Sequence, residues 1–170
     1  AAYRAELDRI ESGENSSNQL FGDLADVIRT WKLPIDLFRD LLDAFAQDVV
    51  KKRYDDYAQL LDYCRRSANP VGRLMLHLVG RTGDDDLRRS DCICSALQLI
   101  NFWQDVAVDW AKDRVYLPQA DLAHFGVAED QIGRNLGREA RDVAQHPLDP
   151  RRQGLGPRQH LGAGVHAPHP

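Results

Sequence analysis

The chain has 170 residues, 43% of them hydrophobic, and carries a formal net charge of −4. This length suits about one domain, and the apolar content is high enough for a folded core. The negative charge and the lack of a clustered basic face exclude an electrostatic case for nucleic-acid binding. No apolar run approaches the roughly 20 residues that a membrane-spanning helix needs.

The first residues, Ala1–Glu11, read as an amphipathic helix already under way, with no signal peptide and no initiating Met. We therefore expect a fragment of a longer protein. The three cysteines, Cys64, Cys92 and Cys94, are odd in number and irregular in spacing. They predict buried thiols in a reducing, cytoplasmic protein rather than a disulfide framework.

The pattern that follows is helical, without period-2 strands. The first helix should end near Ile10, and residues 12–17 should form a loop. Ser17 or Asn18 suits the cap of a second helix that runs to about Trp31, because short polar side chains accept hydrogen bonds from the free N–H groups there. Pro34 suits the first residue of a third helix, since its missing N–H is not needed at that position.

A fourth helix is predicted over about Asp55–Ala68, and Asn69-Pro70 should interrupt it because proline disfavours a helical conformation in the residue before it. The helix should resume over Val71–Val79, and residues 80–83 should form a turn. The longest helix is then expected from Asp84 to about Ala111.

An extended segment, Arg114–Pro118, and two short helices near Gln119–Phe125 and Ala128–Ile132 should follow. From residue 133 to 170 Gly, Pro, His and Arg dominate, and large apolar residues lose helical spacing. Such a stretch buries too little surface to offset its ordering entropy. We expect a helical domain over residues 1–132 and a disordered or loosely attached tail over residues 133–170.

The central helix is apolar on most sides between residues 93 and 110, which is typical of a buried helix. One narrow polar stripe interrupts this surface. Its +3, +4, +4 spacing places all its members on one helix face. The stripe consists of Gln98, Asn101, Asp105 and Asp109. It faces either solvent or an interior cavity, and the spacing alone leaves both readings open.

Asp105 and Asp109 would repel each other one turn apart, and burial would increase the cost unless a cation lies between them. Mg²⁺ is suited to this, because it takes one or two carboxylates and completes its shell with water and substrate phosphates. Lys112, Arg114 and Tyr116 follow within about two turns. Cationic side chains beside such a metal are what a diphosphate group requires, so these residues favour the cavity reading.

Two runs of sequence resemble the squalene/phytoene synthase family. Ala96–Trp110, followed by Arg114–Pro118, resembles the second family signature, Q-x-x-N-x-x-x-D-x-x-x-D and then R-x-Y-L-P. Upstream, Tyr63–Gly72 resembles the family segment Y-C-x-x-x-A-x-x-V-G. Taken alone, this upstream run also fits a core tyrosine and a plain helix kink.

The resemblance implies an all-α fold with helices around a deep apolar cavity. Two aspartate-rich motifs would hold Mg²⁺ against a substrate diphosphate, and Asp105 and Asp109 would be metal ligands in one of them. Arg114 and Tyr116 would contact the diphosphate. The remaining implied site residues are Tyr63 beside the reacting carbons, Gln98 and Asn101 near polar parts of the intermediate, and Ala68, Val71 and Gly72 lining the cavity.

Within the family, Asn101–Val106 and Ser67–Gly72 look most like the hydroxysqualene synthase branch of hopanoid biosynthesis. Gln104 stands where squalene and phytoene synthases typically carry a basic residue. The resemblance implies conversion of presqualene diphosphate to hydroxysqualene with Mg²⁺ and without NADPH. The alternatives are a squalene or phytoene synthase proper, or a non-catalytic helical domain that binds a prenyl lipid.

The first family motif, D-x-x-x-D, should precede the segment that resembles Ala1–Ile10 and is not found there, although Asp36 and Asp40 have the same spacing later in the chain. We therefore expect the fold to be incomplete at both ends and the chain alone to be inactive. Asp36, Asp40, Asp43 and Asp48 have no family motif around them, and Asp36 and Asp40 read as the solvated face of an amphipathic helix. Residues 84–86 are three aspartates that suit the N-terminal end of the long helix. Because the implied substrate is so apolar, we expect peripheral membrane contact. No sequence signal indicates an oligomeric state.

Overall fold

The structure is a computed structural model that describes residues 2–16 and 18–134. Within these residues the elements are α-helices, apart from an isolated bridge between Arg53 and Val115, which confirms the predicted all-α class. The chain forms two compact units, Ala1–Glu129 and Asp130–Pro170. Of the second unit only residues 130–134 are described, and they are helical, so most of the predicted tail lies outside the described residues. Within the described ranges, no helix is long and apolar enough to cross a membrane.

The first two helices, α1 (Ala2–Ser12) and α2 (Gln19–Trp31), pack against each other. Asn18 caps α2 as predicted, because its side-chain oxygen accepts a hydrogen bond from the backbone N–H of Phe21 at 3.2 Å. The apolar side chains between these helices form one buried cluster of the first unit. Its buried members are Leu7, Ile10, Phe21, Ala25, Ile28 and Leu33.

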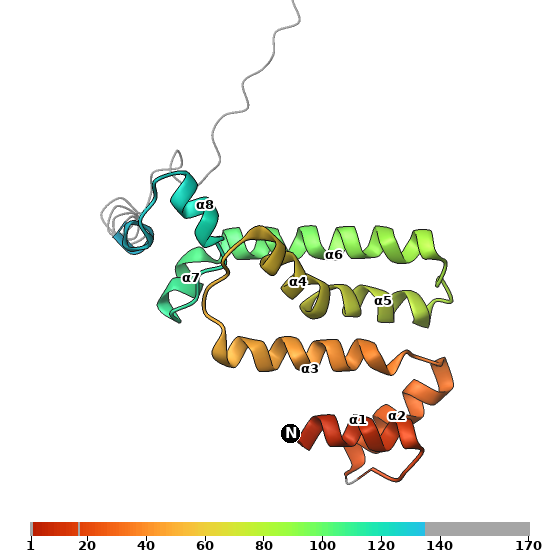
Figure 1. Cartoon of the computed structure of the whole chain (residues 1–170). Helices are drawn as coiled ribbons and strands as arrows, with labels where there is room; N and C mark the ends of the chain where they lie inside the picture. Colours follow the sequence, from red (N-terminus) through yellow and green to blue (C-terminus); the bar gives the residue numbers. More distant parts are fainter. Residues whose placement is uncertain (1, 17, 135–170) are drawn as a thin grey trace, which may run out of the picture. The chain divides into compact units, whose positions relative to one another are not determined.

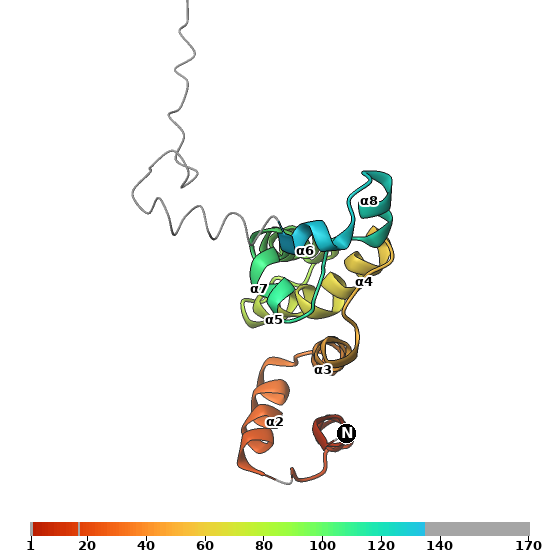
Figure 2. The same ribbon diagram turned by 90° about the vertical axis from the view of Figure 1, so that its left-hand side faces the viewer.

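Helix α3 (Ile35–Val50) lies between α1 and α2 on one side and α4 to α6 on the other, as the turned view shows (Figure 2). Pro34 is its N-cap and not its first helical residue, which corrects the prediction. The reason is that the ψ of Pro34 is 121°, an extended value outside the helical range. Helix α4 (Tyr57–Ser67) begins after Asp56, whose side chain accepts from the N–H of Gln59 at 2.8 Å.

The predicted interruption at Asn69-Pro70 is narrower than expected. Helix α5 (Asn69–Leu78) already begins at Asn69, and only Ala68 separates it from α4. A proline in the first turn of a helix removes no backbone hydrogen bond, which explains why Pro70 fits inside α5. Helix α6 (Asp84–Gln104) then runs back along α5, as Figure 1 shows.

The long helix predicted to reach Ala111 is instead two helices. Helix α6 ends at Gln104, and α7 (Val106–Ala111) follows after Asp105, which has φ −95° and ψ 13°. These angles leave the regular helical range and change the direction of the chain. Helix α8 (Gln119–His124) comes after the segment that contains Val115 and Tyr116.

The prediction that the central helix is buried is also wrong for most of its length. Only Leu99 and Phe102 of α6 are buried, and they point toward α4 and the Tyr116 segment. Several large apolar side chains of the same helix remain exposed because, in the part of the chain that is described, nothing covers them. They are Ile93, Leu97, Ile100 and Trp103. Cys92 is likewise exposed, whereas Cys64 is buried as expected and Cys94 is half-buried.

A second buried cluster joins α3, the segment that follows it, α4, α6 and the segment after α7. It is rich in aromatic rings, and two of the predicted site residues, Tyr63 and Tyr116, belong to it. Its members are Ala44, Tyr54, Leu60, Tyr63, Cys64, Leu99, Phe102 and Tyr116.

Candidate functional site

Four aromatic rings from four different segments pack together in the buried part of the candidate site. Phe102 of α6 and Tyr116 stack in parallel with ring centroids 3.9 Å apart and 5° between their planes. Tyr63 of α4 lies 5.9 Å from Tyr116 and 5.6 Å from Tyr54 between ring centroids. These separations are in the range of favourable aromatic pairs, so the four segments hold one another in place.

Asp48, at the end of α3, connects this aromatic cluster to Arg114. The hydroxyl of Tyr63 donates a hydrogen bond to Asp48 Oδ1 at 2.6 Å. The backbone carbonyl of the same Asp48 accepts from a terminal guanidinium nitrogen of Arg114 at 3.2 Å. Two residues that the sequence assigns to one site are thus joined through a third.

Sequence reasoning missed Asp48, which it noted only as one of several aspartates without a motif. One signal was available. Asp48 lies in the last turn of α3, where no basic residue is present and a negative charge opposes the helix dipole. An acidic residue in such a place needs stabilisation from a partner elsewhere, and here the partner is Tyr63.

The tyrosine hydroxyls in this cluster are strongly biased toward their neutral form. Burial raises the pKa of Tyr63, and the hydrogen bond to Asp48 raises it further. Burial also raises the pKa of Tyr54 and of Tyr116, and the charge of Asp48 acts in the same direction on both. The site therefore contains neutral phenols arranged around one carboxylate.

Asp105 and Asp109 follow the buried Phe102 along the chain. Asp105 is exposed at the break between α6 and α7, and Asp109 is half-buried one turn later. Burial raises the pKa of Asp109; Lys112 and Arg114 oppose the rise, whereas Asp105 and Asp48 add to it. Asp109 therefore lies where bringing in positive charge is favourable.

Arg114 is brought back toward these carboxylates by a tight turn. Asp113 adopts a positive φ of 57°, and the backbone N–H of Arg114 donates to the carbonyl of Asp109 at 2.8 Å. The Nε of Arg114 is buried and has no hydrogen-bond partner. A buried guanidinium donor without an acceptor is costly, so this position suits an anionic ligand.

The residues present fit a Mg²⁺ ion held together with a diphosphate, rather than a site built from protein ligands alone. No group of three or more His, Cys, Asp or Glu side chains is placed to hold a metal ion anywhere in residues 2–16 and 18–134. Mg²⁺ needs only one or two carboxylates when water and phosphate oxygens supply the other ligands. Asp105, Asp109 and the unpartnered donor of Arg114 offer that combination.

The other predicted residues lie farther along the helices. Gln98 is half-buried and Asn101 exposed on α6, in the two turns before Asp105. Ala68 and Gly72 are half-buried, and Val71 is exposed. Their roles beside the substrate stay predictions.

Gly72 has a packing role of its own. A Cβ added at this glycine would collide with Ser90 Oγ and Cys94 Sγ of α6. The absence of a side chain therefore permits the close approach of α5 and α6.

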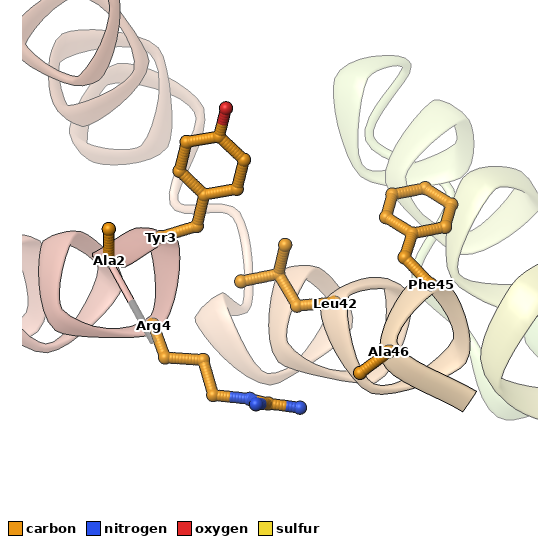
Figure 3. Close-up of a pocket in the computed structure, with 6 residues that line it drawn as sticks. All are labelled: Ala2, Tyr3, Arg4, Leu42, Phe45 and Ala46. Atoms are coloured by element: carbon orange, nitrogen blue, oxygen red, sulfur yellow. The ribbon is translucent and has the colours of Figure 1, made fainter. Parts of the chain in front are cut away.

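The described part of the first unit includes two apolar hollows, and the larger of these two lies away from the predicted site residues. It has a volume of about 380 Å³ between α1 and α3 and is lined by Tyr3, Leu42 and Phe45 among others, as Figure 3 shows. The second, of about 290 Å³, is lined by Trp103, Leu117 and Phe125 together with other apolar side chains. This second hollow borders the aromatic cluster, since Leu60 belongs to both.

The relatives of this chain include hydroxysqualene synthases and phytoene synthases. The chain is 40% identical over 95 residues to a hydroxysqualene synthase of Sinorhizobium fredii, and the aligned region covers 55% of this chain and 32% of the relative. It is 33% identical over 126 residues to a phytoene synthase of Mycobacterium tuberculosis, which covers 74% of this chain and 41% of the relative.

Among solved structures, the squalene synthase HpnC from Alicyclobacillus acidocaldarius matches with a TM-score of 0.73 and 44% identity, over 77% of this chain and 49% of that one. The chain thus spans about a third to a half of the length of these proteins. Residues 1–151 match the sequence profile of squalene/phytoene synthases. With the all-α fold and the arrangement around Asp109 and Arg114, this match shows that the chain belongs to the squalene/phytoene synthase family.

Proposed function

We propose that this chain provides the second diphosphate-binding half of a head-to-head isoprenoid synthase. The observation that carries this proposal is the buried, unpartnered Nε of Arg114 beside the half-buried carboxyl of Asp109. A positive donor and a carboxylate with a raised pKa are complementary to a metal–diphosphate pair and to few other ligands. Asp105 would share the metal with Asp109.

In this proposal the chain's own residues bind, orient and shield the substrate. Mg²⁺, when bound, would neutralise the charge of the departing diphosphate. Arg114 would hold a diphosphate oxygen through its free Nε–H. Tyr116 stacks on Phe102 of α6, and this contact would hold the chain segment that carries Arg114 in place. Tyr63 would face the reacting carbons with a neutral phenol, which stabilises positive charge without reacting with it.

The favoured reaction is the conversion of presqualene diphosphate to hydroxysqualene, with release of diphosphate and without NADPH. Relatives named hydroxysqualene synthase at 40% and 42% identity support this branch. Gln104 is consistent with it, because one cation fewer beside the diphosphate separates this sequence from the usual pattern of squalene and phytoene synthases. A squalene or phytoene synthase proper is the second candidate within the family, and it is favoured by the longer match to a phytoene synthase.

The diphosphate proposal is tested by calorimetric titration of the chain with inorganic diphosphate in the presence and absence of Mg²⁺. We expect binding that depends on Mg²⁺ and that falls about tenfold or more in Asp105→Asn and Asp109→Asn. Asp26→Asn is the matched control, because Asp26 is an exposed aspartate that only pairs with Arg29 on the surface of α2. Equal affinity in all four proteins would overturn the assignment of the metal ligands.

We further propose that the chain contains only one of the two aspartate-rich motifs of the family and therefore does not turn over substrate by itself. Incubation with presqualene diphosphate and Mg²⁺, followed by mass spectrometry, should show bound substrate and no product. Full turnover to an alcohol would refute the inactivity and support the branch, whereas a hydrocarbon formed with NADPH would refute the branch.

A non-catalytic role is distinguished by the same titrations. A helical domain that only binds a prenyl lipid would bind an uncharged prenyl alcohol and show no Mg²⁺-dependent affinity for diphosphate. The apolar hollow lined by Trp103 and Leu117 is the observation that favours this alternative. For the intact protein we expect a cytoplasmic enzyme with peripheral membrane contact, because its substrate is apolar apart from the diphosphate.

A further inference from the structure

Asp48 has no role in the family signatures that this sequence displays, yet it lies at the centre of the candidate site. Its carboxylate accepts the hydroxyl of Tyr63 at 2.6 Å, and its backbone carbonyl accepts Arg114 at 3.2 Å. The C-terminal end of α3, which carries Asp48, lies on the same side of the first unit as α7 (Figure 1). One residue therefore contacts both the predicted diphosphate-binding arginine and the predicted carbocation-facing tyrosine.

The hydroxyl of Tyr63 has two polar neighbours, the carboxylate of Asp48, to which it donates, and the hydroxyl of Tyr116. Tyr54, Phe102 and Tyr116 pack around the ring of Tyr63, with ring centroids 5.6 to 6.0 Å away. Tyr63 itself is only 4% exposed. A hydrogen bond to a charged group is shorter and stronger than one between neutral groups, so Asp48 fixes both the orientation of the phenol and the direction of its proton.

We propose that Asp48 is a positioning residue whose negative charge acts through the hydroxyl of Tyr63 to favour a positively charged carbon in this site. A phenol that donates to a carboxylate becomes more electron-rich at its oxygen and in its ring. Its proton is directed at Asp48 and is not available to a neighbouring substrate. A cationic isoprenoid intermediate gains from such a neighbour, and its uncharged precursor does not.

This inference rests on the proposed function, since it assumes that a prenyl cation forms beside Tyr63. Its test uses two probes bound to the whole chain in the presence of Mg²⁺ and diphosphate. One probe is farnesyl dimethylamine, which is protonated at neutral pH and mimics the cation. The other is its uncharged carbon isostere. Affinities are measured for the original chain, Asp48→Asn, Tyr63→Phe and the double variant.

We expect Asp48→Asn to weaken binding of the ammonium probe roughly tenfold and to leave binding of the uncharged probe within about twofold. Asparagine keeps an oxygen that accepts the Tyr63 hydroxyl, so this variant removes the charge and preserves the fold. In the Tyr63→Phe background, the same substitution should have little further effect, because the two residues act as one unit. Asp43→Asn is the control, since Asp43 is on the same helix and pairs with Arg4 at the surface.

Two outcomes would overturn the proposal. Equal weakening of both probes would show a merely structural role for Asp48. Additive effects of the two substitutions would show that Asp48 does not act through Tyr63.

A second readout is independent of the isoprenoid probes. Tyr63 is replaced by 3-fluorotyrosine, its fluorine resonance is assigned with Tyr63→Phe, and the resonance is followed as the pH is raised. The phenol should ionise at lower pH in Asp48→Asn, because the carboxylate that opposes the phenolate is gone; an unchanged titration would refute the contact. If the titration shifts but neither probe binds, the contact stands, and both the cation role and the proposed function fail.

Discussion

Phe102 and Tyr116 stack in parallel with 3.9 Å between their ring centroids. Phe102 belongs to α6, three residues before Asp105, and Tyr116 follows Arg114 by two residues. The stack therefore fixes the distance between the metal-binding aspartates proposed here and the arginine proposed to hold the diphosphate. This contact explains why the R-x-Y-L-P segment of the signature carries an aromatic residue, Tyr116, at this position.

Replacing Phe102 by alanine should destabilise the chain by about 3–5 kcal/mol, because it removes a buried ring and leaves a cavity against Tyr116. Equilibrium unfolding in urea measures the change. Trp103→Ala is the control, since Trp103 is the next residue and its side chain is 55% exposed. A loss at Trp103 equal to that at Phe102 would contradict the packing described here.

Gly72→Ala should cost about 1–3 kcal/mol of stability, because its new methyl group would overlap Ser90 and Cys94 and force α5 and α6 apart. Gly22→Ala tests the same change without the crowding, since Gly22 lies within α2 and has nothing within 4 Å of an added Cβ. That variant should gain about 0.5–1 kcal/mol from the higher helix propensity of alanine. Thermal unfolding of both variants measures whether each substitution lowers or raises stability. A stabilised Gly72→Ala variant would refute the close contact of α5 and α6.

Asp109→Asn should make the ligand-free chain more stable near about pH 7. The pKa of Asp109 is raised in the folded chain, chiefly by burial and also by Asp105 and Asp48. Its carboxyl therefore ionises less readily when folded, and stability is lost as the pH rises from the ordinary value through the raised one. The asparagine variant avoids this loss.

The advantage of Asp109→Asn should shrink near about pH 3, where the carboxyl is protonated in both states. Added Mg²⁺ and diphosphate should stabilise the original chain and not the variant. A variant less stable than the original chain near pH 7, without ligand, would show that the burial of Asp109 is not costly.

Arg114→Gln should reduce Mg²⁺-dependent diphosphate affinity about tenfold or more, because it removes the buried Nε donor and the contact with the Asp48 carbonyl. Lys112→Gln removes a charge only two residues away, but Lys112 is exposed and its effect should be about threefold or less. Calorimetric titration at two salt concentrations separates them, since binding through an exposed charge is screened more strongly. Similar losses in both variants would indicate a general electrostatic effect instead of a specific contact.

Local chemistry was enough to predict much of the helical layout. The cap at Asn18 and the turn before Asp84 follow from side-chain hydrogen bonding and from glycine, and both lie where they were expected. The helix boundaries at Pro34, Asn69 and Asp105 were less predictable. They depend on backbone angles that neighbouring segments impose, so a residue preference at one position does not determine them.

The sequence by itself determined the family, because the order and spacing of Gln98, Asn101, Asp105, Asp109 and Arg114 match the family signature, and order and spacing are properties of the chain that need no tertiary contact. Only the tertiary structure showed that Asp48 belongs with them. Asp48 precedes Tyr63 by 15 residues and Arg114 by 66, and no helical period relates positions so far apart. Packing of α3 against α4 and the return of the chain after α7 bring these side chains together, and that proximity exists only in the folded chain.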